Sequence, residues 1–241
     1  MMPFNTRILF TGILFTLMSM PYLGVHCQQR EIDSLKKAIE TNTKEDSTKV
    51  IQLNALAYNY YTTNLDDLKV YGYRALILSR QIQYKRGEAV AYKNIGLGYL
   101  ASNANPAALD YFDKSLKIFR DLNDKANSGR VLNNIGYYYG TIKDRRMELS
   151  YLLQALEEIK KLNEPHIKGV LYGNIGNCYE AGQQYKTALY YYNQELAIGQ
   201  SKNIEDIKAS SFANLASVYL KQKKLYRGAL LLQRRSAFKK A

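Results

Sequence analysis

A short segment recurs along this chain at an almost constant spacing. The copies are residues 53–60, 92–99, 132–139, 172–179 and 212–219, of which the first is the weakest. Self-similarity at a fixed period of about 40 residues is typical of stacked repeat proteins, in which each repeat contacts only its neighbours. The period therefore limits the fold more strongly than length or composition does.

Two columns of the repeated segment indicate how it packs. A column of small residues is followed three positions later by a column of tyrosines. The small column is Ala57, Gly96, Gly136, Gly176 and Ala216, and the tyrosine column is Tyr60, Tyr99, Tyr139, Tyr179 and Tyr219. Residues three apart share a helical face, and glycine inside a helix costs about 1 kcal/mol relative to alanine. Glycines in this column therefore predict close approach of a neighbouring helix, with the tyrosine ring covering the seam.

A second helix is expected after each copy of the segment. Ala108 and Phe112 follow Gly96 at a spacing that puts both on one helical face, and Ala188 stands in the same relation to Gly176. Asparagine recurs just beyond this second helix, at Asn123, Asn163 and Asn203. Asparagine suits the left-handed residue that ends a helix, so each repeat is predicted to be a pair of helices.

These columns resemble the tetratricopeptide repeat (TPR) family over roughly residues 49–241. That family has a large apolar residue, a Leu-Gly pair and a Tyr on the first helix, then Ala, Phe and Ala on the second. The period here is longer than the usual one of about 34, and some small positions are replaced. The replacing residues are Lys69 or Leu68, Glu148 and Glu195. The resemblance implies an all-α, right-handed superhelical solenoid of antiparallel helix pairs.

The expected domain organisation has three parts. Residues 1–27 are predicted to be a signal peptide, 28–47 an N-terminal capping helix with a linker, and 48–241 the solenoid. Its repeats are expected at 48–87, 88–127, 128–167, 168–207 and 208–241. Asn64 before two aspartates is typical of a helix start, and Pro106 suits the first turn of a second helix.

The N-terminal segment 1–27 has the features of a secretory signal peptide. Arg7 is its only charge, and residues 8–20 form an apolar run that ends before Pro21. Such a run is short for a membrane span and is typical of a signal-peptide core. Cleavage after Cys27 would start the mature chain at Gln28 and place it in the periplasm or another exported space.

Two alternatives to cleavage stay open. Residues 8–25 can act as an uncleaved membrane anchor. Cys27 can be lipidated, although that signal calls for an apolar residue at position 24 and a small one at 26, where this chain has Gly24 and His26.

The charge of the chain is strongly positive and concentrated near its end. The formal net charge is +13, and removal of Arg7 with the signal peptide lowers it by one, to +12. No acidic residue follows Asp206. Export argues against a nucleic-acid partner. An anionic membrane or envelope surface, or an acidic partner, fits better, and a solvated helix face fits better still.

The sequence contains no pattern that predicts catalysis. It lacks a Gly-Lys-Ser/Thr phosphate loop, a His-Glu-x-x-His motif and a Gly-x-Ser-x-Gly elbow. After cleavage only Cys178 and His166 remain as thiol and imidazole, which is too few for a metal cluster. We therefore expect no enzyme activity, no catalytic residue, no metal and no cofactor. Cys178 is expected to be a buried small side chain, and His166 a solvated residue in a linker.

An asparagine column defines the predicted binding site. It lies two positions before the small column and consists of Asn94, Asn134, Asn174 and Asn214. At about 100° per residue it is turned about 200° from the packed seam. In the related TPR proteins such asparagines face a concave groove and bind the main chain of an extended peptide. The neighbouring positions expected in the groove are Lys93, Asn133, Leu97, Tyr137, Asn177, Leu100 and Glu180. The alternative is that the asparagines bond adjacent helices and only hold the superhelix together.

Two functions are consistent with these features. The leading hypothesis is an exported TPR scaffold that binds a protein or an extended peptide in its groove. The alternative, drawn from the resemblance, is the periplasmic sensory input region of a truncated sensor kinase or transcription regulator. The coding sequence beyond Ala241 would distinguish them. Residues 225–241 are apolar on more than one face, which indicates truncation or packing on a partner or a second copy.

Overall fold

A computed structural model describes residues 28–102, 106–222 and 231–232 of the chain. The expected signal peptide, and the segment 225–241 except for its residues 231–232, lie outside these described residues. The chain divides into two compact units, Met1–Gly98 (unit 1) and Tyr99–Ala241 (unit 2). Within the described ranges, none of the helices combines the length and the apolarity that a membrane crossing requires.

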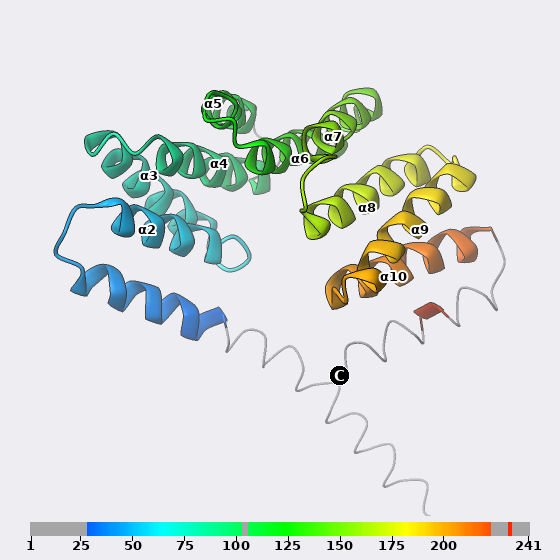
Figure 1. The fold of residues 1–241 in the computed structure, drawn as a ribbon, viewed down its shortest axis with the longest axis horizontal. Coiled ribbons are helices and arrows are strands. Elements are labelled where there is room, and N and C mark those ends of the chain that lie inside the picture. Colours follow the sequence, from blue (N-terminus) through cyan, green and yellow to red (C-terminus); the bar gives the residue numbers. More distant parts are fainter. Residues whose placement is uncertain (1–27, 103–105, 223–230, 233–241) are drawn as a thin grey trace, which may run out of the picture. The chain divides into compact units, whose positions relative to one another are not determined.

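The described residues form helices joined by short turns (Figure 1). In unit 1 these are a helix over residues 28–41, α2 (Ser47–Asn59), α3 (Leu65–Gln81) and most of α4 (Lys85–Ala101). Unit 2 contains α5 (Ala107–Asp121), α6 (Lys125–Thr141), α7 (Arg145–Ile159), α8 (Pro165–Ala181), α9 (Tyr185–Ser201) and α10 (Glu205–Lys221). The N-terminal helix buries Ile32 and Ile39, as its apolar spacing predicts.

Helices of unit 2 pack in pairs and also contact their next-but-one neighbours. α6 packs on α7, α8 packs on α9, and α10 packs on α9. In addition α6 contacts α8, and α8 contacts α10. Because these three are the first helices of successive repeats, they form one layer and their partners form another. The prediction of an all-α solenoid of helix pairs is confirmed; its right-handed superhelical twist stays a prediction.

Residues at the helix starts behave as the sequence predicts, with one correction. The Asn64 side chain accepts hydrogen bonds from the backbone N–H groups of Asp66 and Asp67 in the first turn of α3. Pro106 lies at the start of α5. The expectation that His166 lies in a linker is wrong, because α8 begins at Pro165 and His166 lies in its first turn, 2.8 Å from Asp206. Proline at a first helical position loses no hydrogen bond.

Two of the three asparagines expected to end helices do so. Asn123 and Asn203 have positive φ angles of 52° and 53°. The same expectation for Asn163 is wrong, because it is not among the described residues with positive φ. Here α7 already ends at Ile159, and the Lys168 ammonium donates to the carbonyl oxygens of Lys160 and Leu162. A side-chain donor thus satisfies carbonyls at this helix end.

In four described helix pairs the tyrosine column covers the seam by stacking on a second tyrosine column. The ring centroids lie 5.4 to 5.6 Å apart, with the planes within 8° of parallel. The pairs are Tyr60–Tyr71, Tyr99–Tyr111, Tyr139–Tyr151 and Tyr179–Tyr191. Sequence reasoning missed the second column, although its members recur with the period of the repeat.

The two glutamates that replace small residues occupy space left by glycines elsewhere. A Cβ added to Gly140 would lie 2.8 Å from Glu148 Oε1, and one added to Gly173 would lie 2.9 Å from Glu195 Oε1. Both glutamates are buried, with 8% and 2% of their surface exposed. A glycine on the facing helix therefore makes room for each carboxylate.

Candidate functional site

Unit 2 contains a hollow of about 220 Å³ between α6, α7 and α8, here named the α6–α8 hollow. Its lining includes Tyr137 from α6 and both Asn174 and Asn177 from α8. All three were predicted as groove residues. The Tyr137 side chain is 55% exposed. Residues of adjacent first helices thus meet at one hollow, and an aromatic face and an exposed amide are available there to a ligand.

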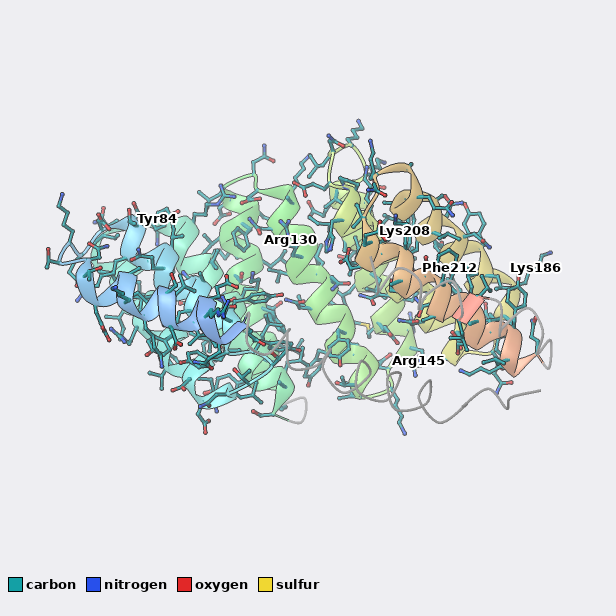
Figure 2. All side chains as sticks on the ribbon, turned by 90° about the horizontal axis from the view of Figure 1, so that it is seen from below. Tyr84, Arg130, Arg145, Lys186, Lys208 and Phe212 are labelled. Carbon is teal, nitrogen blue, oxygen red and sulfur yellow. The ribbon has the colours of Figure 1, made fainter. Side chains whose placement is uncertain are left out.

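The floor of the α6–α8 hollow holds a neutralised ion pair. Arg145, labelled in Figure 2 at the start of α7, donates to the Glu148 carboxylate over 2.6 Å. The Tyr192 hydroxyl donates to the Glu180 carboxylate over 2.6 Å and lies 2.8 Å from Asn177 Oδ1. These bonds fix the polar side chains before any ligand arrives, which reduces the ordering cost of binding.

Unit 1 contains a hollow of about 340 Å³ between α2 and α4, here named the α2–α4 hollow. Its lining includes the predicted residues Lys93 and Asn94, together with Tyr58. The Lys93 ammonium lies 5.7 Å from the centroid of the Tyr58 ring, a cation–π distance. Tyr84 also lines it and lies in the turn before α4 (Figure 2).

Several residues expected to be open to the groove are buried instead. The exposed fraction of Asn94 is 1%, that of Leu97 and Glu180 is 8%, and that of Leu100 is 4%. The expectation of exposure is therefore wrong for these four. Lys93, Asn133, Asn134, Asn174 and Asn214 are half-buried, and Tyr137 and Asn177 are exposed. The contacts of two of them give the physical reason: the Asn94 amide bonds Asn54 on the preceding first helix, and the Glu180 carboxylate accepts from Tyr192 and Ser217.

The asparagine column makes a recurrent contact with the preceding repeat. Asn94 Nδ2 donates to the carbonyl oxygen of Asn54 over 2.9 Å, and Asn174 Nδ2 donates to Asn133 Oδ1 over 2.7 Å. Each acceptor lies just before the asparagine position of its own repeat. In these two asparagines the amide N–H₂ group thus bonds the preceding first helix, as the alternative to ligand binding predicts.

The other two asparagines have different surroundings. For Asn214 the corresponding residue is Gly173, and its Nδ2 donates over 3.0 Å to Glu195 instead. The Asn134 side chain forms no hydrogen bond within the described part of the chain, so its amide is the uncommitted one of the column.

No cluster of metal-ligating side chains occurs among the described residues. Burial, with the neighbouring Glu148, raises the pKa of the Cys178 thiol to about 11, and the residue is 5% exposed. A thiol of that kind is protonated and inert near neutral pH, which confirms Cys178 as a buried small side chain.

Comparison with known proteins shows the fold class. No family model and no curated protein matches the chain. Among solved structures, BtubC (BKLC) from P. vanneervenii is 18% identical, with a TM-score of 0.69 over 88% of this chain and 90% of that one. A Rap protein complexed with competence and sporulation factor is 15% identical, with a TM-score of 0.73 over 92% and 73% of the two chains. NprR in complex with its cognate peptide NprX is 18% identical, with a TM-score of 0.64 over 97% and 68%.

Solved structures with TPR-like repeats are among these neighbours, and this chain has a TPR-type helical-repeat fold. Sequence identities of 15% to 18% support a shared fold and nothing more. The function therefore has to be argued from the hollows themselves.

Proposed function

We propose that this protein is an exported TPR-type scaffold that binds an extended segment of a partner protein across α6 and α8. The observation that carries the proposal is the α6–α8 hollow, where Tyr137 and Asn177 are exposed on adjacent first helices. Asn134 lies one turn before Tyr137 on the same helix face. An uncommitted amide offers both a donor and an acceptor, which is what a peptide unit requires.

Two structural neighbours support a peptide as the occupant. The Rap structure contains competence and sporulation factor, and the NprR structure contains the peptide NprX. The size of the hollow, about 220 Å³, suits a few side chains rather than a folded domain. An extended segment whose main chain meets Asn134 and whose side chain packs on Tyr137 fits both features.

To test the groove, peptides that bind the mature protein are selected from a displayed random library. We expect Asn134→Ala and Tyr137→Ala each to weaken a selected peptide by about tenfold or more, which is about 1.4 kcal/mol. Melting should stay nearly unchanged, since neither side chain is buried. Fluorescence anisotropy of the labelled peptide measures the affinity, and circular dichroism measures the melting.

Tyr190→Ala is the matched control for this experiment. Tyr190 is 59% exposed on the second helix α9 and lines neither hollow. Its loss should leave peptide binding intact. Equal binding by the parent, Asn134→Ala and Tyr137→Ala, or failure of any peptide to be selected, would contradict the proposed groove. Asn174→Ala serves as a structural reference, because it removes the bond to Asn133 and should lower melting.

Export is proposed on the short apolar run 8–20 and its flanks. The chain should be cleaved near Cys27 when it is expressed with its own leader in a bacterial host. The intact mass of the exported protein, measured by mass spectrometry, should then correspond to a start close to Gln28. Recovery of exported protein that still begins with Met1 would exclude cleavage and favour the anchor.

A further inference from the structure

The α2–α4 hollow and the α6–α8 hollow differ in charge. The α2–α4 hollow is lined by two cationic side chains, Arg86 and Lys93, and the other described residues of its lining are neutral. The α6–α8 hollow instead holds Arg145 against the Glu148 carboxylate. The first lining is therefore net positive and the second is balanced, so the two hollows favour ligands of different charge.

The α2–α4 hollow also has an apolar wall next to its cations. Ile51 and Tyr58 are 56% and 57% exposed, and both line the hollow. The Lys93 ammonium lies over the Tyr58 ring, so a cation and an apolar surface are adjacent. Exposed apolar side chains that line a concavity with charged neighbours are typical of binding sites.

Asn94, which lines this hollow, carries a buried acceptor without a donor. Asn54 Nδ2 donates to the Gly87 carbonyl oxygen over 3.2 Å, and Asn94 Nδ2 donates to the Asn54 carbonyl oxygen and to Asn54 Oδ1. Because both partners of Asn94 are acceptors, its amide orientation is fixed. Asn94 Oδ1 then remains without a hydrogen bond, on a residue that is 1% exposed.

An unsatisfied buried acceptor costs roughly 1–3 kcal/mol. A ligand that brings an N–H group to Asn94 Oδ1 removes this cost. The main chain of a peptide supplies such donors at every residue except proline. The hollow therefore favours a peptide over a ligand that carries only acceptors.

We propose that the α2–α4 hollow binds a peptide segment in which acidic side chains flank an apolar one. The carboxylates meet Arg86 and Lys93, the apolar side chain packs on Ile51 and Tyr58, and a main-chain N–H bonds Asn94. This inference rests on the proposed peptide-binding function and adds the chemistry of the segment that unit 1 selects. The carboxylate belongs to a side chain, and a peptide terminus is the competing source.

The probes are short labelled peptides that differ only in charge. One is Ser-Glu-Leu-Glu-Leu-Glu-Ser with both ends capped, the second replaces each Glu by Gln, and the third is the Gln peptide with a free terminal carboxylate. At about 50 mM salt we expect the acidic peptide to bind at least about tenfold more tightly than either Gln peptide. The preference should shrink at about 500 mM salt, where charges are screened within a few ångströms.

Variants show which side chains cause the preference for the acidic peptide. Arg86→Gln combined with Lys93→Gln should abolish the preference for the acidic peptide. Lys117→Gln combined with Lys186→Gln removes the same charge from exposed positions of unit 2, seen for Lys186 in Figure 2, and should preserve the preference. Tyr58→Ala should weaken the acidic peptide while leaving its salt dependence in place.

Three outcomes would overturn this inference. They are equal binding of the acidic and capped Gln peptides, tight binding of only the free-terminus peptide, and equal loss of preference in both double variants. Binding of the library-selected peptide distinguishes failure of the charge selection in unit 1 from failure of the proposed peptide-binding function. If that peptide still binds in a manner that depends on Tyr137, only the charge selection in unit 1 is wrong.

Discussion

Replacing Gly176 by leucine is expected to lower the free energy of unfolding by about 1–3 kcal/mol or more. A Cβ added at this position would lie 2.6 Å from Tyr192 Cδ1, far inside van der Waals contact. The ring cannot move aside, because Tyr192 is fully buried, its hydroxyl donates to Glu180, and that hydroxyl also lies 2.8 Å from Asn177 Oδ1. Gly136→Leu should act in the same direction, since its Cβ would lie 3.0 Å from Leu152 and 3.3 Å from the Glu148 carbonyl oxygen.

Gly182→Leu is the matched control for the packing glycines. Gly182 caps α8 with a φ of −81°, and an added Cβ would meet only backbone oxygens at 3.5 and 3.7 Å. These are ordinary contacts, so stability should change by less than about 0.5 kcal/mol, as for other surface substitutions. Thermal unfolding followed by circular dichroism gives the comparison. If Gly176→Leu melted with the parent, the assignment of this column to helix packing would have to be abandoned.

The glycine and tyrosine columns could be recognised in the sequence because similar contacts recur in successive described helix pairs. A side chain that meets an equivalent neighbour in successive repeats recurs with the period of the repeat. The spacing of such residues alone indicates which helix face they occupy. Tyr111 and Tyr151 recur with the same period on the second helix and could have been paired with Tyr99 and Tyr139. The fold was therefore predictable to the level of individual stacking columns.

The candidate site was predictable only in part, because its chemistry depends on residues that vary between repeats. Asn134 and Asn174 look equivalent in the sequence, yet one amide is uncommitted among the described residues and the other is bonded to Asn133. The difference could not be predicted from the column itself, because the partner of Asn174 is Asn133, a residue outside the column.

Periodicity also says nothing about which exposed apolar residues line a hollow. Ile51 and Tyr58 lie on the solvent side of α2 and break no pattern, so sequence reasoning passed over them. Arg145 and Glu148 were missed as site residues for a related reason, since they begin α7, outside the repeated segment of the first helices. Such residues become visible only when neighbouring helices are placed in space.

The Glu195 carboxylate lies in the interior between α9 and α10. Its hydrogen-bond donors among the described residues are uncharged. It is 2% exposed, and its oxygens accept from the Ser210 hydroxyl and from Asn214 Nδ2. Burial raises the pKa of Glu195 to about 7, and the two hydrogen bonds offset only part of this effect. Glu180 provides the contrast: burial raises its pKa too, but hydrogen bonds from Lys221, Tyr192 and Ser217 outweigh burial and leave the pKa below its ordinary value.

The protein is therefore expected to lose stability as the pH rises from about 4.5 to about 7, through the titration of Glu195. Over this window the unfolded chain has released the proton while the folded chain still holds it, so deprotonation favours unfolding. A shift from 4.5 to about 7 corresponds to a loss of about 3 kcal/mol at high pH. Glu195→Gln, which stays neutral, should match the parent near pH 4.5 and exceed its stability by up to that amount near about pH 8.

Urea unfolding of the parent and of Glu195→Gln across this pH range measures the difference directly. Glu180→Gln is the matched control, because loss of a carboxylate whose pKa is lowered should destabilise the protein near about pH 8 and have little effect at low pH. The two variants should thus diverge from the parent in opposite directions as the pH rises. Parallel profiles for the parent and Glu195→Gln would show that Glu195 is already ionised in the folded protein, and that Ser210 and Asn214 suffice to hold its charge.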